Sequence, residues 1–167
     1  MKHTFFKGRL LNVSVKKVTL PNGYVVPLEV VKHPGAVLVI PFLTQRKVII
    51  LKQLRPVVKK YLYELPAGTL EKGEQPMRCA RREIIEETGY SAGALTRLGV
   101  IFPVPGYSTE KIVIYKAEHL RKVTQQHQAD EVIQVQTITK SRLKYLFSHG
   151  KIVDAKTICA FALCGWL

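Results

Sequence analysis

Residues 68–90 read GTLEKGEQPMRCARREIIEETGY, and they hold an unusual concentration of glutamate and arginine for one short helix. Pro76 suits the first turn of a helix, and Gly89 suits the left-handed residue that follows a helix end. The sequence therefore predicts a helix over residues 76–88, preceded by a loop bounded by glycines 68 and 73. Three apolar residues at helical spacing are expected to face the core: Met77, Ala80 and Ile84.

Glu83, Glu86 and Glu87 are three or four residues apart and would lie on one face of this helix. Like charges at that spacing repel, so the helix needs something that neutralises them. A hard divalent cation does this well, because carboxylate oxygens suit Mg²⁺ or Mn²⁺. The alternative is a solvated acidic face balanced by the arginines beside it, and the spacing alone leaves both interpretations open.

The preceding loop favours the metal interpretation. Gly68, five residues, Glu74, seven residues and then REIIEETGY (82–90) together resemble the complete Nudix box. This resemblance implies an enzyme that hydrolyses a nucleoside diphosphate linked to another moiety, using divalent metal. The implied fold is α/β, an α/β/α sandwich with a mixed β-sheet, plus a small N-terminal antiparallel β-sheet.

The resemblance also implies a set of metal ligands. Glu83 and Glu87 would be the main ligands, Glu86 an additional ligand or a support to them, and Ala67 would offer its carbonyl oxygen. The implied ion is Mg²⁺, with Mn²⁺ as a substitute.

Further catalytic residues follow from the same resemblance. Arg82 would pair with Glu74 and hold the loop against the helix. A loop glutamate would act as general base for the attacking water, and Glu131 is the candidate, with Asp130 as the alternative. On its own, an acidic pair at the start of a strand is more often simply solvated.

Several stretches outside the box resemble the ADP-ribose pyrophosphatase branch of this family: HPGAV (33–37), QLRP (53–56), ELPAG (64–68), PVPGYSTE (103–110) and GKIVDAKTICAFAL (150–163). They imply substrate contacts at Arg55, Glu64, Pro105, Gly106 and Glu110. Arg55 suits a diphosphate because a guanidinium fork matches it. The alternatives are that Arg55 is a surface arginine at a strand end and that Glu110 is an ordinary loop carboxylate.

Composition sets wider limits. The chain has 167 residues, 47% of them hydrophobic, which suffices for one well-packed core. Its net charge of +14 comes from lysines and arginines spread along the chain, and it favours an anionic partner. The three cysteines form no CxxC pair, which predicts packed, reduced thiols. With neither a signal-peptide pattern nor an apolar run of membrane-spanning length, we expect a cytoplasmic protein without membrane association.

The remaining pattern predicts strands separated by turns and ended by two helices. We expect residues 1–34 to form an N-terminal β-sheet for dimerisation or substrate contribution, and residues 35–167 to form the hydrolase domain. Helices are expected at 140–149 and at 154–166, with Asp154 as N-cap. The expected strands are 10–18, 24–31, 36–42, 47–51, 98–102, 111–117 and 132–138.

We therefore expect Mg²⁺-dependent hydrolysis of the diphosphate bond of ADP-ribose or related ADP-sugars, giving AMP and ribose 5-phosphate. The resemblance also implies a homodimer. One alternative is a GDP-mannose or broad-specificity nucleoside-diphosphate-sugar pyrophosphatase. A second is an RNA 5′-end pyrophosphohydrolase, which the charge suggests but which would need a basic, aromatic-lined groove. A third, a nucleotide-binding regulator without activity, is disfavoured by the intact carboxylates.

Overall fold

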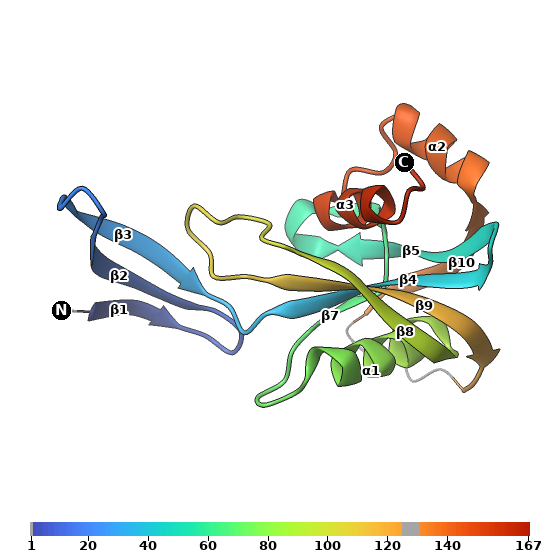
Figure 1. The fold of residues 1–167 in the computed structure, drawn as a ribbon, viewed down its shortest axis with the longest axis horizontal. Helices are drawn as coiled ribbons and strands as arrows, with labels where there is room; N and C mark the ends of the chain where they lie inside the picture. Colours follow the sequence, from blue (N-terminus) through green and yellow to red (C-terminus); the bar gives the residue numbers. More distant parts are fainter. Residues whose placement is uncertain (1, 125–130) are drawn as a thin grey trace.

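A computed structural model describes residues 2–124 and 131–167. For residues 2 and 3 it describes the backbone alone. Two sheets and three helices make up this part of the chain (Figure 1). The elements in chain order are β1 (Lys2–Lys7), β2 (Asn12–Thr19), β3 (Val25–Lys32), β4 (Ala36–Thr44), β5 (Lys47–Arg55), the 3₁₀ turn η1 (Pro56–Val58), β6 (Lys60–Glu64), β7 (Ala67–Thr69), α1 (Pro76–Thr88), β8 (Tyr90–Ile101), β9 (Ile112–Lys122), β10 (Ile133–Thr139), α2 (Lys140–Ser148) and α3 (Ala155–Leu163).

The large sheet is mixed. Its described strands run in the order β10-β5-β4-β9-β8, with β6 paired to β5 and β7 paired to β4. Only the β4–β9 pair is parallel within these residues, and the other pairs are antiparallel. Helix α1 covers one face of the sheet, while α2 and α3 cover the other (Figure 1). The α/β/α sandwich that the sequence predicted is therefore confirmed.

Strand β4 explains why both faces are covered. Its side chains alternate between two buried clusters, with Leu38 and Ile40 on the side of α2 and α3 and Val37 and Val39 on the side of α1. All four are fully buried. A strand without polar alternation is typical of a sheet with two covered faces, because neither set of side chains meets water.

The small sheet β1-β2-β3 is antiparallel and projects away from the large one (Figure 1). The expected separate N-terminal sheet is thus present, although its first strand, β1, was not predicted. Strand β3 continues almost directly into β4, so the division at residue 34 stays a prediction about domains.

The β8–β9 connection reaches toward this small sheet. Val31 of β3 donates its backbone N–H to the carbonyl of Tyr107 at 2.8 Å and accepts from the N–H of Thr109 at 3.0 Å. These two bonds attach the connection to the end of β3, next to the point where the chain enters the large sheet. The connection is therefore held at both its ends and at its middle.

Other boundaries moved from their expected positions. Strand β8 begins at Tyr90, directly after helix α1, and not near residue 98. Strands β6 and β7 were not among the expected strands, because they are too short to show an alternating pattern. Helix α3 has the expected N-cap, because the Asp154 side chain accepts a hydrogen bond from the Thr157 N–H at 3.0 Å. The three cysteines are free, but Cys159 is exposed and not packed as expected.

Candidate active site

Helix α1 has the predicted bounds, residues 76–88. Pro76 lies in its first turn, and Gly89 ends it in the left-handed conformation, with φ of 72° and its N–H bonded to the carbonyl of Ile85. Ala80 and Ile84 are fully buried as expected, but Met77 is 46% exposed, so its predicted place in the core is wrong. Cys79, fully buried in the same cluster, supplies the contact in the first turns instead.

Two of the helix glutamates face inward. Glu83 is 5% exposed and Glu87 is 2% exposed, whereas Glu86 is less buried. Burial raises the pKa of Glu83 to about 7, against the opposing effect of Arg82. Burial, followed by the charge of Glu83, raises the pKa of Glu87 well above its ordinary value. A bound cation would offset both the burial of these two carboxylates and the repulsion between them, so the pair suits a cation.

Gly68 leaves the space that Glu83 occupies. A Cβ at this position would lie 1.7 Å from Oε1 of Glu83 and 1.9 Å from its Cδ, well inside any real contact. Only glycine therefore lets the carboxylate lie against the backbone of β7. In the same loop, the N–H of Ala67 donates to Oε2 of Glu87 at 3.0 Å. The strand thus aligns both buried carboxylates along one short stretch of backbone.

Arg82 links the loop to the helix. Its Nε and Nη2 lie 3.2 Å from the two carboxylate oxygens of Glu74, and its Nη1 lies 2.6 Å from Oε1 of Glu83 and 3.1 Å from Oε2 of Glu86. The hydrogen bond from Arg82 holds the pKa of Glu74 below its usual value. The contact between Arg82 and Glu74 is the one that the sequence analysis anticipated.

The donor set fits a divalent metal ion. Among the residues that the structure describes, no group of three or more His, Cys, Asp or Glu side chains is arranged to hold a metal ion. Arg82 instead lies against Glu83 and Glu86. The oxygens present are nevertheless the type that Mg²⁺ prefers, and the close approach at Gly68 and the Ala67 N–H hold the Glu83 and Glu87 carboxylates beside the same short stretch of β7.

Glu131 lies in the same region. A cleft of about 540 Å³, called here the Glu83 cleft, lies beside these residues. It is lined by Glu83, Arg82, Glu131, Arg55, Ala67–Leu70, Glu71, Leu10 and Arg9. The charge of Glu131 contributes to the raised pKa of both Glu83 and Glu87, which shows that the three carboxylates are neighbours. Asp130, the alternative base, lies outside the described residues.

Arg55 belongs to a second group of charges. Its Nε and Nη2 donate to Oε1 and Oε2 of Glu64 at 2.7 and 2.8 Å. Glu64 is 1% exposed and also accepts from Nζ of Lys156, which in turn lies 2.7 Å from Oδ1 of Asp154. Burial raises the pKa of Glu64, but the hydrogen bond from Arg55 and the charge of Lys156 outweigh it, and the pKa is lowered.

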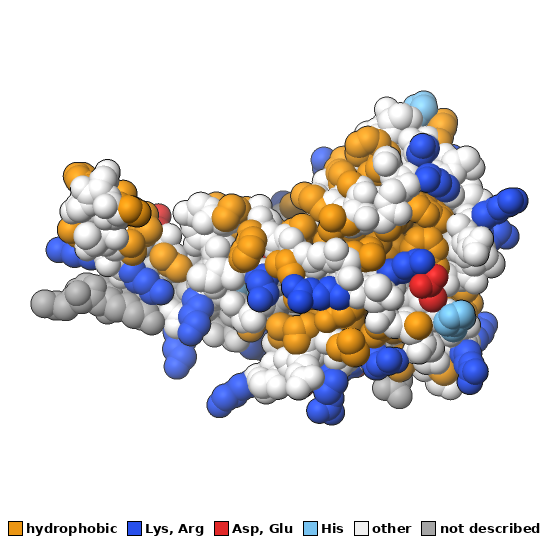
Figure 2. Space-filling view, viewed as in Figure 1, with side chains coloured by type: hydrophobic (Ala, Val, Ile, Leu, Met, Phe, Trp, Pro, Cys, Tyr) orange, Lys and Arg blue, Asp and Glu red, His pale blue; other side chains and the backbone are white. Residues whose placement is uncertain are grey.

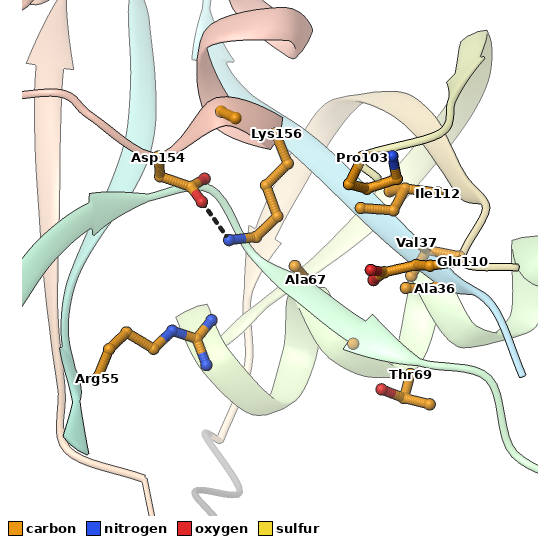
Figure 3. Close-up of a pocket in the computed structure, with 12 residues that line it drawn as sticks. Ala36, Val37, Arg55, Ala67, Thr69, Pro103, Glu110, Ile112, Asp154 and Lys156 are labelled. Carbon is orange, nitrogen blue, oxygen red and sulfur yellow. Dashed lines mark hydrogen bonds and ion pairs between the residues drawn. The ribbon is translucent and has the colours of Figure 1, made fainter. Parts of the chain in front are cut away.

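These charges line a cavity of about 380 Å³, called here the Arg55 cavity (Figure 3). It is formed by Arg55, Asp154, Ala155 and Lys156, by Ala67–Thr69 of β7, by Ala36 and Val37 of β4, and by Pro103, Glu110 and Ile112. Glu110 is therefore among the residues that line this cavity, and its contact with substrate stays a prediction. Pro105 and Gly106 lie in an exposed turn and are not among the lining residues, so their contact with substrate stays a prediction.

Sequence reasoning did not identify Lys156 as part of the site. The available signal was its position two residues after Asp154, at the start of a helix that begins with that N-cap. A local pattern cannot show that this turn meets Glu64, which lies 92 residues earlier in the chain. The contact forms because the start of α3 lies against the end of β6, where the Leu65 N–H donates to Oγ1 of Thr157 at 3.0 Å.

Comparison with known proteins agrees with this geometry. Residues 32–159 match the NUDIX domain family. The chain belongs to the NUDIX family. Relatives that are at least 30% identical also align with most of the chain. The protein is therefore a Nudix hydrolase.

An ADP-ribose pyrophosphatase of Bacillus subtilis is 37% identical and covers 95% of this chain and 87% of its own length. A methanol dehydrogenase activator of Bacillus methanolicus is 36% identical, over 93% and 85%. A GDP-mannose pyrophosphatase of Salmonella arizonae is 32% identical, over 74% and 69%. The solved structure of an ADP compounds hydrolase matches the fold with a TM-score of 0.84 at 21% identity, and the match covers 98% of this chain and 89% of that one.

Proposed function

We propose that this Nudix hydrolase cleaves the diphosphate bond of ADP-ribose or a related ADP-sugar in the presence of Mg²⁺, giving AMP and ribose 5-phosphate. The observation that carries the proposal is that Glu83 and Glu87 lie against Gly68 and Ala67, two residues that line both the Arg55 cavity and the Glu83 cleft. The ADP-ribose pyrophosphatase among the relatives supports this choice of substrate.

Glu83, Glu87 and the carbonyl of Ala67 would hold the metal, with Glu86 as a further ligand or a support. Bound there, Mg²⁺ supplies charge neutralisation for the diphosphate and makes a coordinated water more acidic. Mn²⁺ has the same preference for oxygen ligands and would substitute for it. The chain contributes the positions of these oxygens, which the backbone of β7 and the turn spacing of α1 fix.

Arg82 and Glu74 act as positioning residues. The bonds between them join the loop to the helix, so the backbone of Ala67 and Gly68 stays in line with Glu83 and Glu87. Glu64 has the same type of role in the other half of the site, because both its oxygens are engaged and it is buried. We assign Glu64 to the support of Arg55 rather than to direct contact with substrate.

Glu131 would take the proton of the attacking water. The water oxygen forms the new bond to phosphorus, the bond from phosphorus to the bridging oxygen breaks, and that oxygen leaves on the second product. Arg55 would bind phosphate oxygens during this exchange, and Glu110 would face the sugar. The proximity of Glu131 to Glu83 and Glu87 supports this assignment over a solvated loop carboxylate.

A homodimer in the cytoplasm is the form in which we propose the enzyme acts. The small sheet exposes a group of large apolar side chains that a second copy could cover: Phe5 at 71%, Phe6 at 58%, Tyr24 at 65% and Val25 at 51%. Figure 2 shows hydrophobic side chains gathered on this part of the molecule. In the described residues, no helix has both the length and the apolar character needed to cross a bilayer.

The deciding experiment is a hydrolysis panel with Mg²⁺ that compares kcat/KM for ADP-ribose, ADP-glucose, GDP-mannose and 5′-triphosphorylated RNA. A clear lead for ADP-ribose is expected. A lead for GDP-mannose would keep the chemistry and replace the substrate, and the GDP-mannose pyrophosphatase among the relatives is the reason to include it. A lead for RNA would mean that the lysines and arginines scattered over the visible face in Figure 2 act together as a binding surface.

A further inference from the structure

Two cations on one wall of the Arg55 cavity share a single buried carboxylate. Arg55 binds Glu64 through two nitrogens, and Lys156 binds the same group through Nζ. Glu64 is 1% exposed, whereas the side chains of Arg55 and Lys156 are 39% and 20% exposed. The carboxylate therefore lies behind the cations, and the cations face the cavity.

Each cation keeps a donor for a ligand. Arg55 uses Nε and Nη2 on Glu64, which leaves the Nη1 edge of its guanidinium. Lys156 has three N–H donors and uses two of them, on Glu64 and Asp154. In Figure 3 the two head groups point into the same space, from β5 and from the start of α3. Two converging donors of positive charge suit a phosphoryl group.

The opposite wall has a different character. The carboxylate of Glu110 points into the cavity from the side facing Arg55 and Lys156 (Figure 3). Between these charges the lining is aliphatic, from Ala36, Val37 and Ile112. Among the described residues, the lining includes no aromatic ring on which a base could stack. A ligand with an anionic end and hydroxyl groups at the other end fits this distribution, and a nucleobase does not.

The Arg55 cavity also meets the Glu83 cleft at a shared border. Arg55, Ala67, Gly68 and Thr69 line both spaces. A diphosphate that crossed this border would have one phosphoryl group on each side, with Glu83 next to it. The sugar phosphate would then lie in the Arg55 cavity and the nucleoside toward the Glu83 cleft.

We propose that Lys156 is a substrate-binding residue, and that with Arg55 it holds the phosphoryl group of the sugar half, while Glu110 accepts hydrogen bonds from the sugar hydroxyls. Glu64 is the positioning residue that sets the distance between the two cations. The inference rests on the proposed function for its ligand, a sugar phosphate. It adds a residue and a direction of binding that the proposed function leaves open.

The test compares product binding in Lys156→Met, in Lys156→Arg and in Lys151→Met. The last variant removes an exposed lysine of the α2–α3 connection that does not line the cavity. Calorimetry with ribose 5-phosphate and with AMP, both in the presence of Mg²⁺, gives the two affinities separately. We expect Lys156→Met to weaken ribose 5-phosphate binding about 10-fold or more and to leave AMP binding unchanged.

Lys156→Arg should recover part of this loss, and Lys151→Met should bind both products like the wild type. Unchanged ribose 5-phosphate affinity in Lys156→Met, or an equal loss of affinity for both products, would overturn the proposal. A merely structural role of Lys156 predicts the equal loss, because a displaced Arg55 would affect the shared border of both spaces.

A measurement on the wild-type protein tests the same proposal even if the Lys156→Met variant misfolds. Reductive methylation followed by peptide mass spectrometry reports how accessible the amine of Lys156 is. Ribose 5-phosphate should protect Lys156 at least about threefold while AMP does not, because a bound phosphoryl group covers the remaining donor. Equal labelling with and without ribose 5-phosphate contradicts the assignment.

These results separate the two proposals. If ribose 5-phosphate binding depends on Lys156 but ADP-ribose is not hydrolysed, the substrate assignment fails and the binding site stands. If ADP-ribose is the best substrate and ribose 5-phosphate neither protects nor depends on Lys156, the proposed function stands and the binding site fails.

Discussion

Nη1 of Arg82 lies 2.6 Å from Oε1 of Glu83, one residue further along the same helix. The same nitrogen lies 3.1 Å from Oε2 of Glu86. The guanidinium therefore neutralises part of the acidic cluster at the position where a metal ion would act on the same oxygens. The cluster is stabilised within the protein itself, and a bound cation would have to compete with this arginine for Glu83.

This competition leads to a prediction about metal and stability. Mg²⁺ should raise the melting temperature of the wild-type protein by about 5 °C at saturation, because an ion that binds only the folded state stabilises it. Glu83→Gln should lose most of this rise. Thermal melts with and without Mg²⁺, and after chelation, measure it. The matched control is Glu118→Gln, because Glu118 is a partly exposed carboxylate on β9 that is paired with Lys116. An equal rise in all three proteins would place the metal elsewhere.

Glu87 should be essential for turnover. Glu87→Gln keeps the shape of the side chain and an oxygen that can accept from the Ala67 N–H, so we expect the fold to persist. We expect kcat/KM to fall by about 100-fold or more, since the substitution removes a charge from the metal-binding group. Steady-state kinetics on the best substrate of the panel, with circular dichroism as the check on folding, measures this. Wild-type activity would show that Glu87 is not a ligand.

Gly68→Ala should damage the site with little change elsewhere. The added methyl group would overlap the Glu83 carboxylate at 1.7 Å, so the carboxylate has to move away from the backbone of β7. We expect a loss of kcat/KM of about 100-fold together with weaker Mg²⁺ binding. Gly99→Ala is the control, because its methyl meets only the flexible end of Leu163, at 3.3 Å. Equal activity of the two variants would contradict the role of Gly68 in leaving space for the Glu83 carboxylate.

Glu64 should make stability depend on pH in the acid range. Its pKa is lowered in the folded protein, chiefly because the bond from Arg55 outweighs burial, so the unfolded chain binds more protons near its ordinary pKa of roughly 4.3. The contribution is present above that value and is lost as pH falls through the folded pKa.

Glu64→Gln should therefore lower the free energy of unfolding by about 2 kcal/mol at neutral pH and flatten its fall at acid pH. Urea unfolding between about pH 3 and pH 7 measures both effects. Glu29→Gln, an exposed carboxylate on β3, serves for comparison and should follow the wild type. A wild-type slope in Glu64→Gln would show that this carboxylate does not carry the dependence.

The catalytic helix could be predicted because its signals are local. Pro76 and Gly89 mark its ends, and the glutamate spacing places the carboxylates on one side without any knowledge of the remaining chain. The direction in which they face could not be predicted this way. Glu83 and Glu87 are buried against β7, a three-residue strand whose place in the sheet depends on its pairing with β4.

The second half of the site was only partly predictable for the same reason. Arg55 and Glu110 were found through motifs that resemble known relatives, and both line the cavity. Lys156 and the shared role of Glu64 depend on contacts between residues far apart in the chain. Pairing at such distances leaves no periodic trace in the sequence, so it becomes visible only in the folded structure.

The position of Ala36 has a consequence for the order in which the protein folds. This residue pairs with Thr69 on one side and with Ile112 on the other, so the strand it begins joins both halves of the site. Contacts between segments so distant in sequence close large loops and form slowly. We expect helix α1 to form early, from its own local signals, and the active site to be assembled late, when β4 has recruited both partners. Newly made chains would then pass through a stage that contains the acidic helix but cannot yet catalyse.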